Sequence, residues 1–244
     1  MLIHLVNPNT TASMTAKAAD VARSVAAAGT VIRADQPADG PVSIEGPYDA
    51  AFAVPGMLGR IREAIEAGAD AHVIACFDDT GLDAARALSA RPVIGIGEAA
   101  FHVATLVAER FSVVTTLSRS IATIEANLAR YGLSARCARV RAAEVPVLAL
   151  EEEGSQACDR SSAEIARAMA EDRAEAIVLG CAGMTDLARR LQAIHGVPVV
   201  DGVAAAVTLA EGLVRLGLAT SKIGSWARPV AKSYAGIFAG QMPV

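Results

Sequence analysis

The 244-residue sequence predicts an α/β protein of two similar lobes, each a parallel sheet flanked by helices. The segment Ala69–Cys76 (ADAHVIAC) reappears 105 residues later as Ala174–Cys181 (AEAIVLGC), and each copy ends in a cysteine. Apolar runs of strand length also alternate with helical stretches along the whole chain, which is typical of parallel sheets. The repeat is too long for a solenoid, so we expect a duplicated domain whose lobes are related by a pseudo-two-fold axis, with the active site between them.

The predicted strands are eight continuous apolar runs. They cover residues 2–6, 30–34, 71–75, 92–96, 111–115, 137–141, 175–179 and 197–200. Their hydrophobicity is continuous rather than alternating, which favours strands that are buried on both faces.

The predicted helices end at glycines, which accept the left-handed backbone that follows many helices. The first begins at Thr10 or Thr11 and ends at Gly29; the others span about 47–68, 118–132 and 185–196. After Gly217 we expect a loop, then a short helix at 230–239 that packs on the first lobe. The predicted lobes are residues 1–97 with 207–244, and residues 98–206.

Composition excludes several functional classes. The chain is 53% hydrophobic with a net charge of −4, so nucleic acids and anionic membranes are not expected partners. Its first residues read as a strand rather than a signal peptide, and no apolar run reaches the roughly 20 residues of a membrane span. We therefore expect a cytoplasmic protein with reduced cysteines. No metal-binding spacing of Cys or His occurs, so we expect no metal and no cofactor.

Cys76 and Cys181 are the candidate catalytic residues, because both follow a predicted strand at equivalent points of the repeat. Ligands of parallel sheets bind at the carboxyl ends of strands, where backbone N–H groups favour thiolate over thiol. Two acid/base groups of one kind that face each other can invert a stereocentre, because one removes a proton while the other delivers one. Cys137 and Cys158 lack this symmetry and are assigned to packing or to the surface.

Other candidate substrate-binding groups surround the two cysteines. The backbone N–H groups after them are predicted donors to a developing oxyanion: Phe77, Asp78, Ala182 and Gly183. Four short polar side chains are either substrate ligands or ordinary cap and turn residues: Asn7, Thr80, Thr115 and Thr116.

Two further segments near the cysteines have open interpretations. A carboxylate beside a thiol opposes thiolate formation, so we expect Asp78 or Asp79 to point away and cap the following helix. The irregular segment 35–47 is either a surface connection or a flap over the cleft.

The sequence resembles the hydantoin racemases of the aspartate/glutamate racemase superfamily over nearly its whole length. The motifs that carry the resemblance are Asn7-Pro-Asn-Thr-Thr11, Cys76-Phe-Asp-Asp-Thr-Gly81, Val113-Val-Thr-Thr116, Gly180-Cys-Ala-Gly-Met184 and Thr220-Ser-Lys222. The resemblance implies cofactor-independent racemisation by Cys76 and Cys181 in a homo-oligomer. It also implies that Ile44 lies near the C5 substituent of the substrate.

Alternatives to a hydantoin substrate remain. Allantoin racemases share most of these motifs, but Asp78-Asp79-Thr80 favours hydantoin. Another two-cysteine amino-acid racemase or an isomerase of dicarboxylates must bind carboxylate groups and so needs cations, and the nearest candidates, Arg119 and Lys222, are interpreted as surface charges. A decarboxylase needs only one protonating thiol, and a noncatalytic binding module needs no matched thiols.

Overall fold

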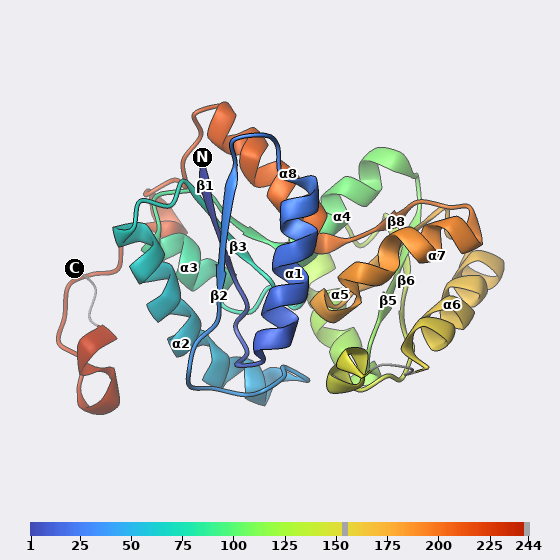
Figure 1. The fold of residues 1–244 in the computed structure, drawn as a ribbon, viewed down its shortest axis with the longest axis horizontal. Helices are drawn as coiled ribbons and strands as arrows, with labels where there is room; N and C mark the ends of the chain where they lie inside the picture. The colour runs from blue at the N-terminus through green and yellow to red at the C-terminus, as the bar shows by residue number, and fades with distance from the viewer. Residues whose placement is uncertain (153–155, 242–244) are drawn as a thin grey trace.

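A computed structural model describes residues 1–152 and 156–241, and it contains two four-stranded parallel sheets (Figure 1). The first sheet holds β1 (Leu2–Val6), β2 (Val31–Asp35), β3 (Ala71–Ile74) and β4 (Val93–Gly95) in the order β2-β1-β3-β4. The second holds β5 (Phe111–Thr115), β6 (Cys137–Ala142), β7 (Ala176–Gly180) and β8 (Val199–Val200) in the order β6-β5-β7-β8. The two orders are equivalent, strand for strand, so the predicted duplicated α/β fold is confirmed.

Helices connect the strands and cover both sheets. They are α1 (Ala12–Val25), α2 (Pro47–Glu66), α3 (Leu82–Leu88), α4 (Ile96–Val107), α5 (Ile121–Arg130), α6 (Ala157–Arg167), α7 (Ala188–His195) and α8 (Gly202–Arg215). None of the helices in the described part of the chain is long and apolar enough to cross a membrane.

Helices α4 and α8 lie between the two sheets, and each packs on the sheet of the other half of the chain (Figure 1). Helix α4 contacts β7 and β8, whereas α8 contacts β3 and β4. The division into lobes of residues 1–97 with 207–244 and of residues 98–206 stays a prediction, and its second boundary falls inside α8.

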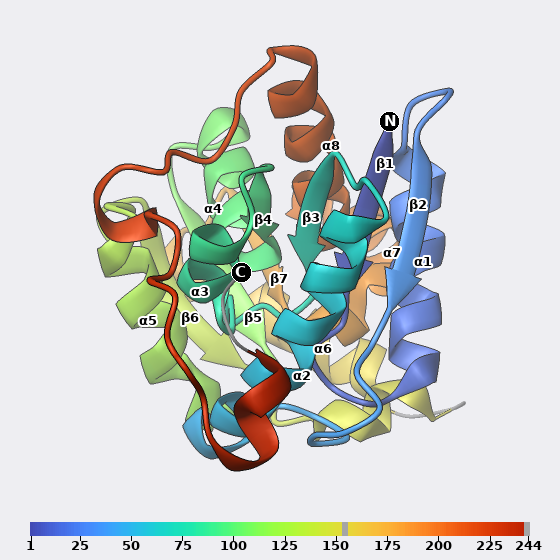
Figure 2. The same cartoon turned by 90° about the vertical axis from the view of Figure 1, so that its left-hand side faces the viewer.

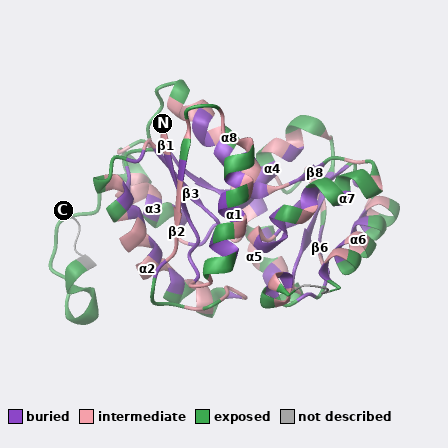
Figure 3. Ribbon diagram, in the orientation of Figure 1, coloured by how far each residue is buried: buried purple, intermediate pink, exposed green. Residues whose placement is uncertain are grey.

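The main hydrophobic core is continuous across the two lobes. The inner strands are buried and the edge strands β2 and β6 only partly so, whereas the outer helices expose their outward faces (Figure 3). Phe101 of α4 is fully buried, and its ring centroid lies 5.4 Å from that of Phe77, 6.0 Å from that of Phe111 and 6.3 Å from that of Tyr131. The residue after Cys76 is therefore packed into the region where the lobes meet.

Two predictions about helices are wrong, one for the end of a helix and one for a whole helix. Helix α1 ends at Val25 rather than Gly29, because Ala26 is extended and the Ala27 N–H donates to the buried Glu211 carboxylate of α8 at 2.9 Å. The predicted helix at 230–239 is only a 3₁₀ turn at Gly236–Gln241. Residues 230–240 are exposed, so no apolar face is buried to stabilise a helix there.

The segment after α8 packs on the first lobe, as expected from the sequence. It runs past α3 to its last turn beside α2 (Figure 2). Trp226 donates from Nε1 to Asp83 at 3.1 Å and stacks under the guanidinium of Arg86 at 4.8 Å.

The start of α4 has no room for a side chain at Gly97. A Cβ there would overlap the carbonyl oxygen of Phe77 and would lie 2.9 Å from Oδ2 of Asp79. We predict that Gly97→Ala lowers the free energy of unfolding by about 1–3 kcal/mol, measured by chemical denaturation.

The matched control is Gly212→Ala in α8, where a Cβ meets no atom within 4 Å. This variant is expected to keep or slightly raise stability, because Ala favours the helix by about 1 kcal/mol over Gly. Equal stability losses in both variants would contradict the close approach at Gly97.

Candidate active site

Cys76 and Cys181 occupy equivalent turns in the two lobes. Cys76 follows β3 and Cys181 follows β7, the third strands of their sheets. The Cys76 carbonyl accepts from the Asp79 N–H at 3.0 Å, and the Cys181 carbonyl accepts from the Met184 N–H at 3.1 Å. Each sulfur accepts a backbone N–H from two residues ahead, Asp78 for Cys76 and Gly183 for Cys181.

Both cysteines line one small cavity between the lobes. Its volume is about 40 Å³, and both thiols are half-buried. The first lobe contributes Asn9, Met14, Ile44, Ala75, Phe77 and Asp78, and the second contributes Thr116, Ser120, Val147, Gly180 and Ala182. Both cysteines therefore line the same small cavity.

The two thiols are protonated at neutral pH. Burial, followed by the charge of Asp78, raises the pKa of Cys76 to about 12, although the Thr80 hydroxyl and the Asp78 N–H act in the opposite direction. Burial also raises the pKa of Cys181 to about 12, against the effect of the Gly183 N–H. The backbone N–H groups lower both pKa values, in the direction expected from the sequence, but desolvation outweighs them.

The two acidic residues after Cys76 point in different directions. The Asp78 side chain lines the cavity, and burial raises the pKa of its carboxyl to about 6. The Asp79 carboxylate points away and accepts from the N–H groups of Gly97 at 3.0 Å and Glu98 at 2.8 Å and from the Tyr131 hydroxyl at 2.7 Å. One acidic side chain does point away as predicted, but it caps α4 rather than the following helix α3.

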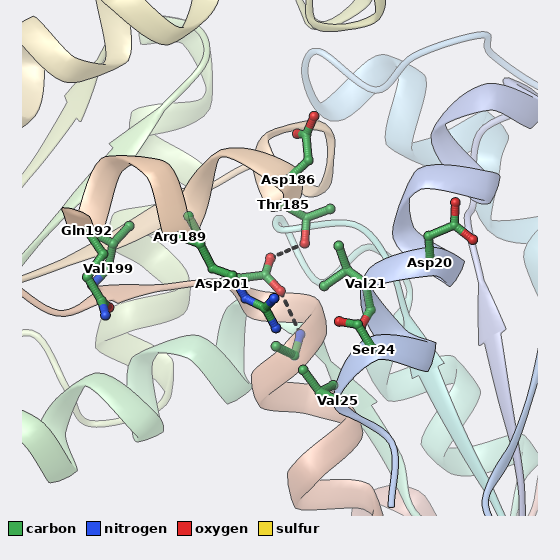
Figure 4. A pocket seen from close by; sticks show the side chains of 12 residues that line it. Asp20, Val21, Ser24, Val25, Thr185, Asp186, Arg189, Gln192, Val199 and Asp201 are labelled. Carbon is green, nitrogen blue, oxygen red and sulfur yellow. Dashed lines mark hydrogen bonds between the residues drawn. The ribbon is translucent and has the colours of Figure 1, made fainter. Parts of the chain in front are cut away.

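The second lobe fastens its cysteine turn in a similar way. Asp201 caps α8 by accepting from the Ala204 N–H at 2.7 Å, and it also accepts a hydrogen bond from the Thr185 hydroxyl, four residues after Cys181 (Figure 4). These residues lie beside a cavity of about 390 Å³ between α1 and α7. This larger cavity contains neither thiol, so it is not the candidate active site.

Five of the predicted substrate-binding residues line the thiol cavity. They are Ile44, Phe77, Asp78, Thr116 and Ala182. Since Ile44 is among them, the segment between β2 and α2 covers the cavity rather than running elsewhere over the surface. Their roles in substrate binding stay predictions.

The other four predicted residues, Asn7, Thr80, Thr115 and Gly183, do not line the cavity. They form contacts within the segments around it. The Asn7 amide donates to Asn9 and Thr11 in the loop after β1 and to the Thr15 hydroxyl in α1. The Thr115 hydroxyl donates to the Gly180 carbonyl at 2.9 Å.

The remaining two of these four lie directly behind the thiols. Thr80 Oγ1 lies 3.4 Å from the Cys76 sulfur. A Cβ at Gly183 would lie 2.7 Å from a methyl carbon of Leu150, so a side chain fits there when Leu150 shifts. These contacts favour structural roles for all four residues.

The sequence interpretation missed several lining residues, among them Asn9, Met14, Ser120 and Val147. Asn9 belongs to the motif after β1, so its position was a usable signal. Met14 and Ser120 lie at the starts of helices that follow strands, where ligands of parallel sheets gather. Val147 had no sequence signal, because it belongs to a loop that reaches the cavity from the edge strand β6.

The charges that act on Cys181 are those of Asp78, Lys17 and Glu151, none of them from the two cations considered in the sequence. Arg119 is exposed beside Gly46, and Lys222 donates to the carbonyl groups at the end of α3, including Ala87 at 3.2 Å. Cys137 and Cys158 pack on the edges of the two cores. Among residues 1–152 and 156–241, no group of three or more His, Cys, Asp and Glu side chains has a metal-binding arrangement.

The chain is similar to known racemases along its whole length. Residues 3–210 match the family model described as Asp/Glu/Hydantoin racemase. A hydantoin racemase of Rhizobium meliloti is 54% identical over 97% of this chain and 98% of its own, and one of Pseudomonas sp. (strain NS671) is 43% identical over 97% and 95%. The solved structure of an allantoin racemase from Klebsiella pneumoniae is 48% identical and covers 100% of both chains with a TM-score of 0.98.

We predict that Asp78→Asn lowers the pKa of both thiols, because the charge of Asp78 raises both. At pH 9, below both pKa values, iodoacetamide is then expected to alkylate Cys76 and Cys181 faster. The gain is about threefold for each unit by which the pKa falls, since the larger thiolate fraction outweighs the lower nucleophilicity. Mass spectrometry of the two cysteine peptides measures both rates.

The matched control is Glu66→Gln at the exposed end of α2, which removes the same charge far from the thiols. Its alkylation rates are expected to equal those of the unmodified protein. Unchanged rates in Asp78→Asn would show that the Asp78 charge does not reach the sulfurs.

Proposed function

The chain belongs to the Asp/Glu/hydantoin racemase family, and we propose that it is a cofactor-independent racemase of 5-substituted hydantoins. The observation that carries the proposal is the equivalent placement of Cys76 and Cys181 at one cavity between duplicated lobes. The hydantoin racemases that resemble this chain cover nearly its full length, which supports the substrate class.

The proposed reaction uses the two cysteines from opposite faces of C5. One thiolate removes the C5 proton, and the thiol on the other face delivers a proton to the resulting carbanion. In the reverse direction the two residues exchange roles. The high pKa that burial gives each thiol makes its thiolate a strong base, at the cost of a small thiolate population at neutral pH.

The charge that develops on the neighbouring carbonyl oxygen needs hydrogen-bond donors. Among the four predicted N–H donors, those of Asp78 and Gly183 already point at the sulfurs. No hydrogen bond is described for the N–H groups of Phe77 and Ala182, and both residues line the cavity. We therefore assign the oxyanion contacts to Phe77 and Ala182.

The neutral ring of a hydantoin suits this cavity better than a dicarboxylate does. Among the described residues that line it, no side chain is cationic and Asp78 carries a carboxyl group. Both proposed bases are needed for racemisation, whereas a decarboxylase needs one. The proposal includes a cytoplasmic location and assembly into a homo-oligomer.

Allantoin racemisation is the second candidate. The specific observation in its favour is the similarity to the Klebsiella pneumoniae structure over the complete chain. A substrate panel distinguishes the two: each single enantiomer of 5-methylhydantoin, 5-benzylhydantoin and allantoin is incubated with the protein, and the decay of optical rotation is followed. Faster decay with the alkylhydantoins supports the first proposal, and decay with allantoin alone supports the second.

We predict that racemisation survives exhaustive chelation and is abolished by thiol alkylation. A hydantoin analogue that competes with substrate is expected to slow the alkylation, because it covers the sulfurs. Cys137→Ala and Cys158→Ala are the matched controls and are expected to keep turnover and sensitivity to alkylation. Loss of activity on chelation would contradict cofactor independence.

We also predict a division of labour between the cysteines. Cys76→Ala and Cys181→Ala each lower racemisation by at least about 10²-fold, because general acid–base catalysis typically contributes that much. The remaining thiolate still removes the C5 proton from the enantiomer that faces it and returns a solvent proton to the same side. Deuterium exchange with retention therefore persists for one enantiomer in the first variant and for the opposite enantiomer in the second.

Proton NMR in heavy water measures this exchange for each pure enantiomer. Cys137→Ala is the control and is expected to racemise and exchange both enantiomers. Exchange of the same enantiomer by both active-site variants would replace the two-base mechanism with a one-base mechanism.

A further inference from the structure

Two equivalent loops approach the thiol cavity, one from each lobe. Residues 36–46 connect β2 to α2, and the loop that begins at residue 143 connects β6 to α6. The strands β2 and β6 hold the same edge position in their sheets. Each loop places one branched aliphatic side chain on the cavity wall, Ile44 from the first lobe and Val147 from the second.

Each loop is fastened at its base to its own lobe. In the first, the Thr10 N–H donates to the Pro41 carbonyl at 3.0 Å and the Thr11 hydroxyl donates to the Val42 carbonyl at 2.6 Å. In the second, the N–H groups of Ala143 and Val145 donate to the carbonyl groups at the end of β5, at 2.9 and 3.0 Å. Each loop is therefore positioned by the lobe to which it belongs.

The loops meet above the thiols through one polar contact. The Val147 N–H donates to Oε1 of Glu45 at 3.1 Å, and among the hydrogen bonds and ion pairs of the described residues this is the one that joins the two loops. The Glu45 N–H is itself held by Asp49 of α2 at 3.0 Å. Val147 is only 4% exposed, so its side chain faces inward.

The cavity is too small for a substituted ring while the loops meet. Its volume of about 40 Å³ is far below the roughly 300–1,000 Å³ of pockets that hold a small-molecule ligand. Entry of a substituted ring requires the loops to separate, which breaks the Glu45–Val147 hydrogen bond. The second loop is also held to α1 of the first lobe, because Lys17 donates to the Leu150 carbonyl at 3.0 Å and pairs with Glu151 at 2.9 Å.

The two-base mechanism places the C5 substituent between the loops. The carbanion at C5 is planar, and its plane lies between the two sulfurs, so the substituent leaves the ring in that plane. Such a substituent meets a wall from each lobe. Resting on the proposed racemase function, we propose that Val147 determines which C5 substituents are accepted, opposite Ile44, and that Glu45 latches the two loops around the bound substrate.

The test compares kcat/KM for 5-methyl- and 5-benzylhydantoin in wild-type protein and in variants. Val147→Ala shortens a side chain in the wall and so enlarges the pocket. It is expected to raise the ratio of kcat/KM for 5-benzylhydantoin to that for 5-methylhydantoin about tenfold, since small apolar differences in a pocket change discrimination by that order. Val147→Phe is expected to lower the ratio. A loss of folded protein would lower kcat/KM for both substrates alike, so opposite changes of the ratio in the two variants indicate an effect on the pocket.

The matched control is Val42→Ala, on the same loop as Ile44 but with its side chain 56% exposed. It is expected to leave the ratio unchanged. Because the equilibrium constant of a racemisation is one, kcat/KM for the two enantiomers must stay equal in every variant, which checks the assay. An unchanged ratio in both Val147 variants would overturn the specificity role while wild-type racemisation keeps the proposed function intact.

Glu45 is tested as a positioning residue. Glu45→Ala is expected to lower kcat/KM by a similar factor for both substrates, because the closed state loses its latch. Glu45→Gln is expected to restore most of the loss, since an amide oxygen also accepts the Val147 N–H. Wild-type kinetics in Glu45→Ala would overturn the latch, and failure of wild-type protein to racemise any hydantoin would instead overturn the proposed function.

Discussion

The carboxylate of Asp79 ties the turn of Cys76 to the second lobe. It accepts three hydrogen bonds, two from the first N–H groups of α4 and one from Tyr131. Burial raises the pKa of Asp79 to about 7, so the carboxyl is only partly charged at neutral pH, and its hydrogen bonds contribute roughly 0.5–3 kcal/mol each, most when it is ionised. Since α4 packs on the sheet of the second lobe, the position of Cys76 is set relative to Cys181 as well as to its own strand.

This constraint explains the local sequence around it. Gly95 and Gly97 approach the Asp79 carboxylate so closely that any side chain at either position would overlap it. Asp79 also has a left-handed backbone with φ of 50°, a conformation that Asp adopts more readily than most residues. In the second lobe Asp201 caps α8 and bonds Thr185, so each cysteine turn is joined through a carboxylate to the helix that crosses to the other sheet.

Enclosure of the thiols has two opposing chemical effects. Burial disfavours the thiolate, which raises the pKa of both cysteines, and Asp78 adds to the effect. The same exclusion of water strengthens each hydrogen bond to charge that develops in the site, and it increases the basicity of a thiolate once formed. A symmetric site suits a reaction whose two directions are mirror images, because both thiols need the same environment.

The sequence by itself determined the strands, the duplicated order of the lobes and the two cysteines, because these follow from local hydrophobic runs and an internal repeat. Seven of the eight strands lie within about one residue of their predicted starts. Tertiary structure alone decided the end of α1, which depends on Glu211 from the far end of the chain, and the use of Asp79 as a cap for α4 rather than α3. It also decided that Asn7 holds a loop while Asn9 and Val147 line the cavity, and that burial keeps the thiols protonated. Each of these depends on which distant groups surround a side chain, and local sequence does not specify that environment.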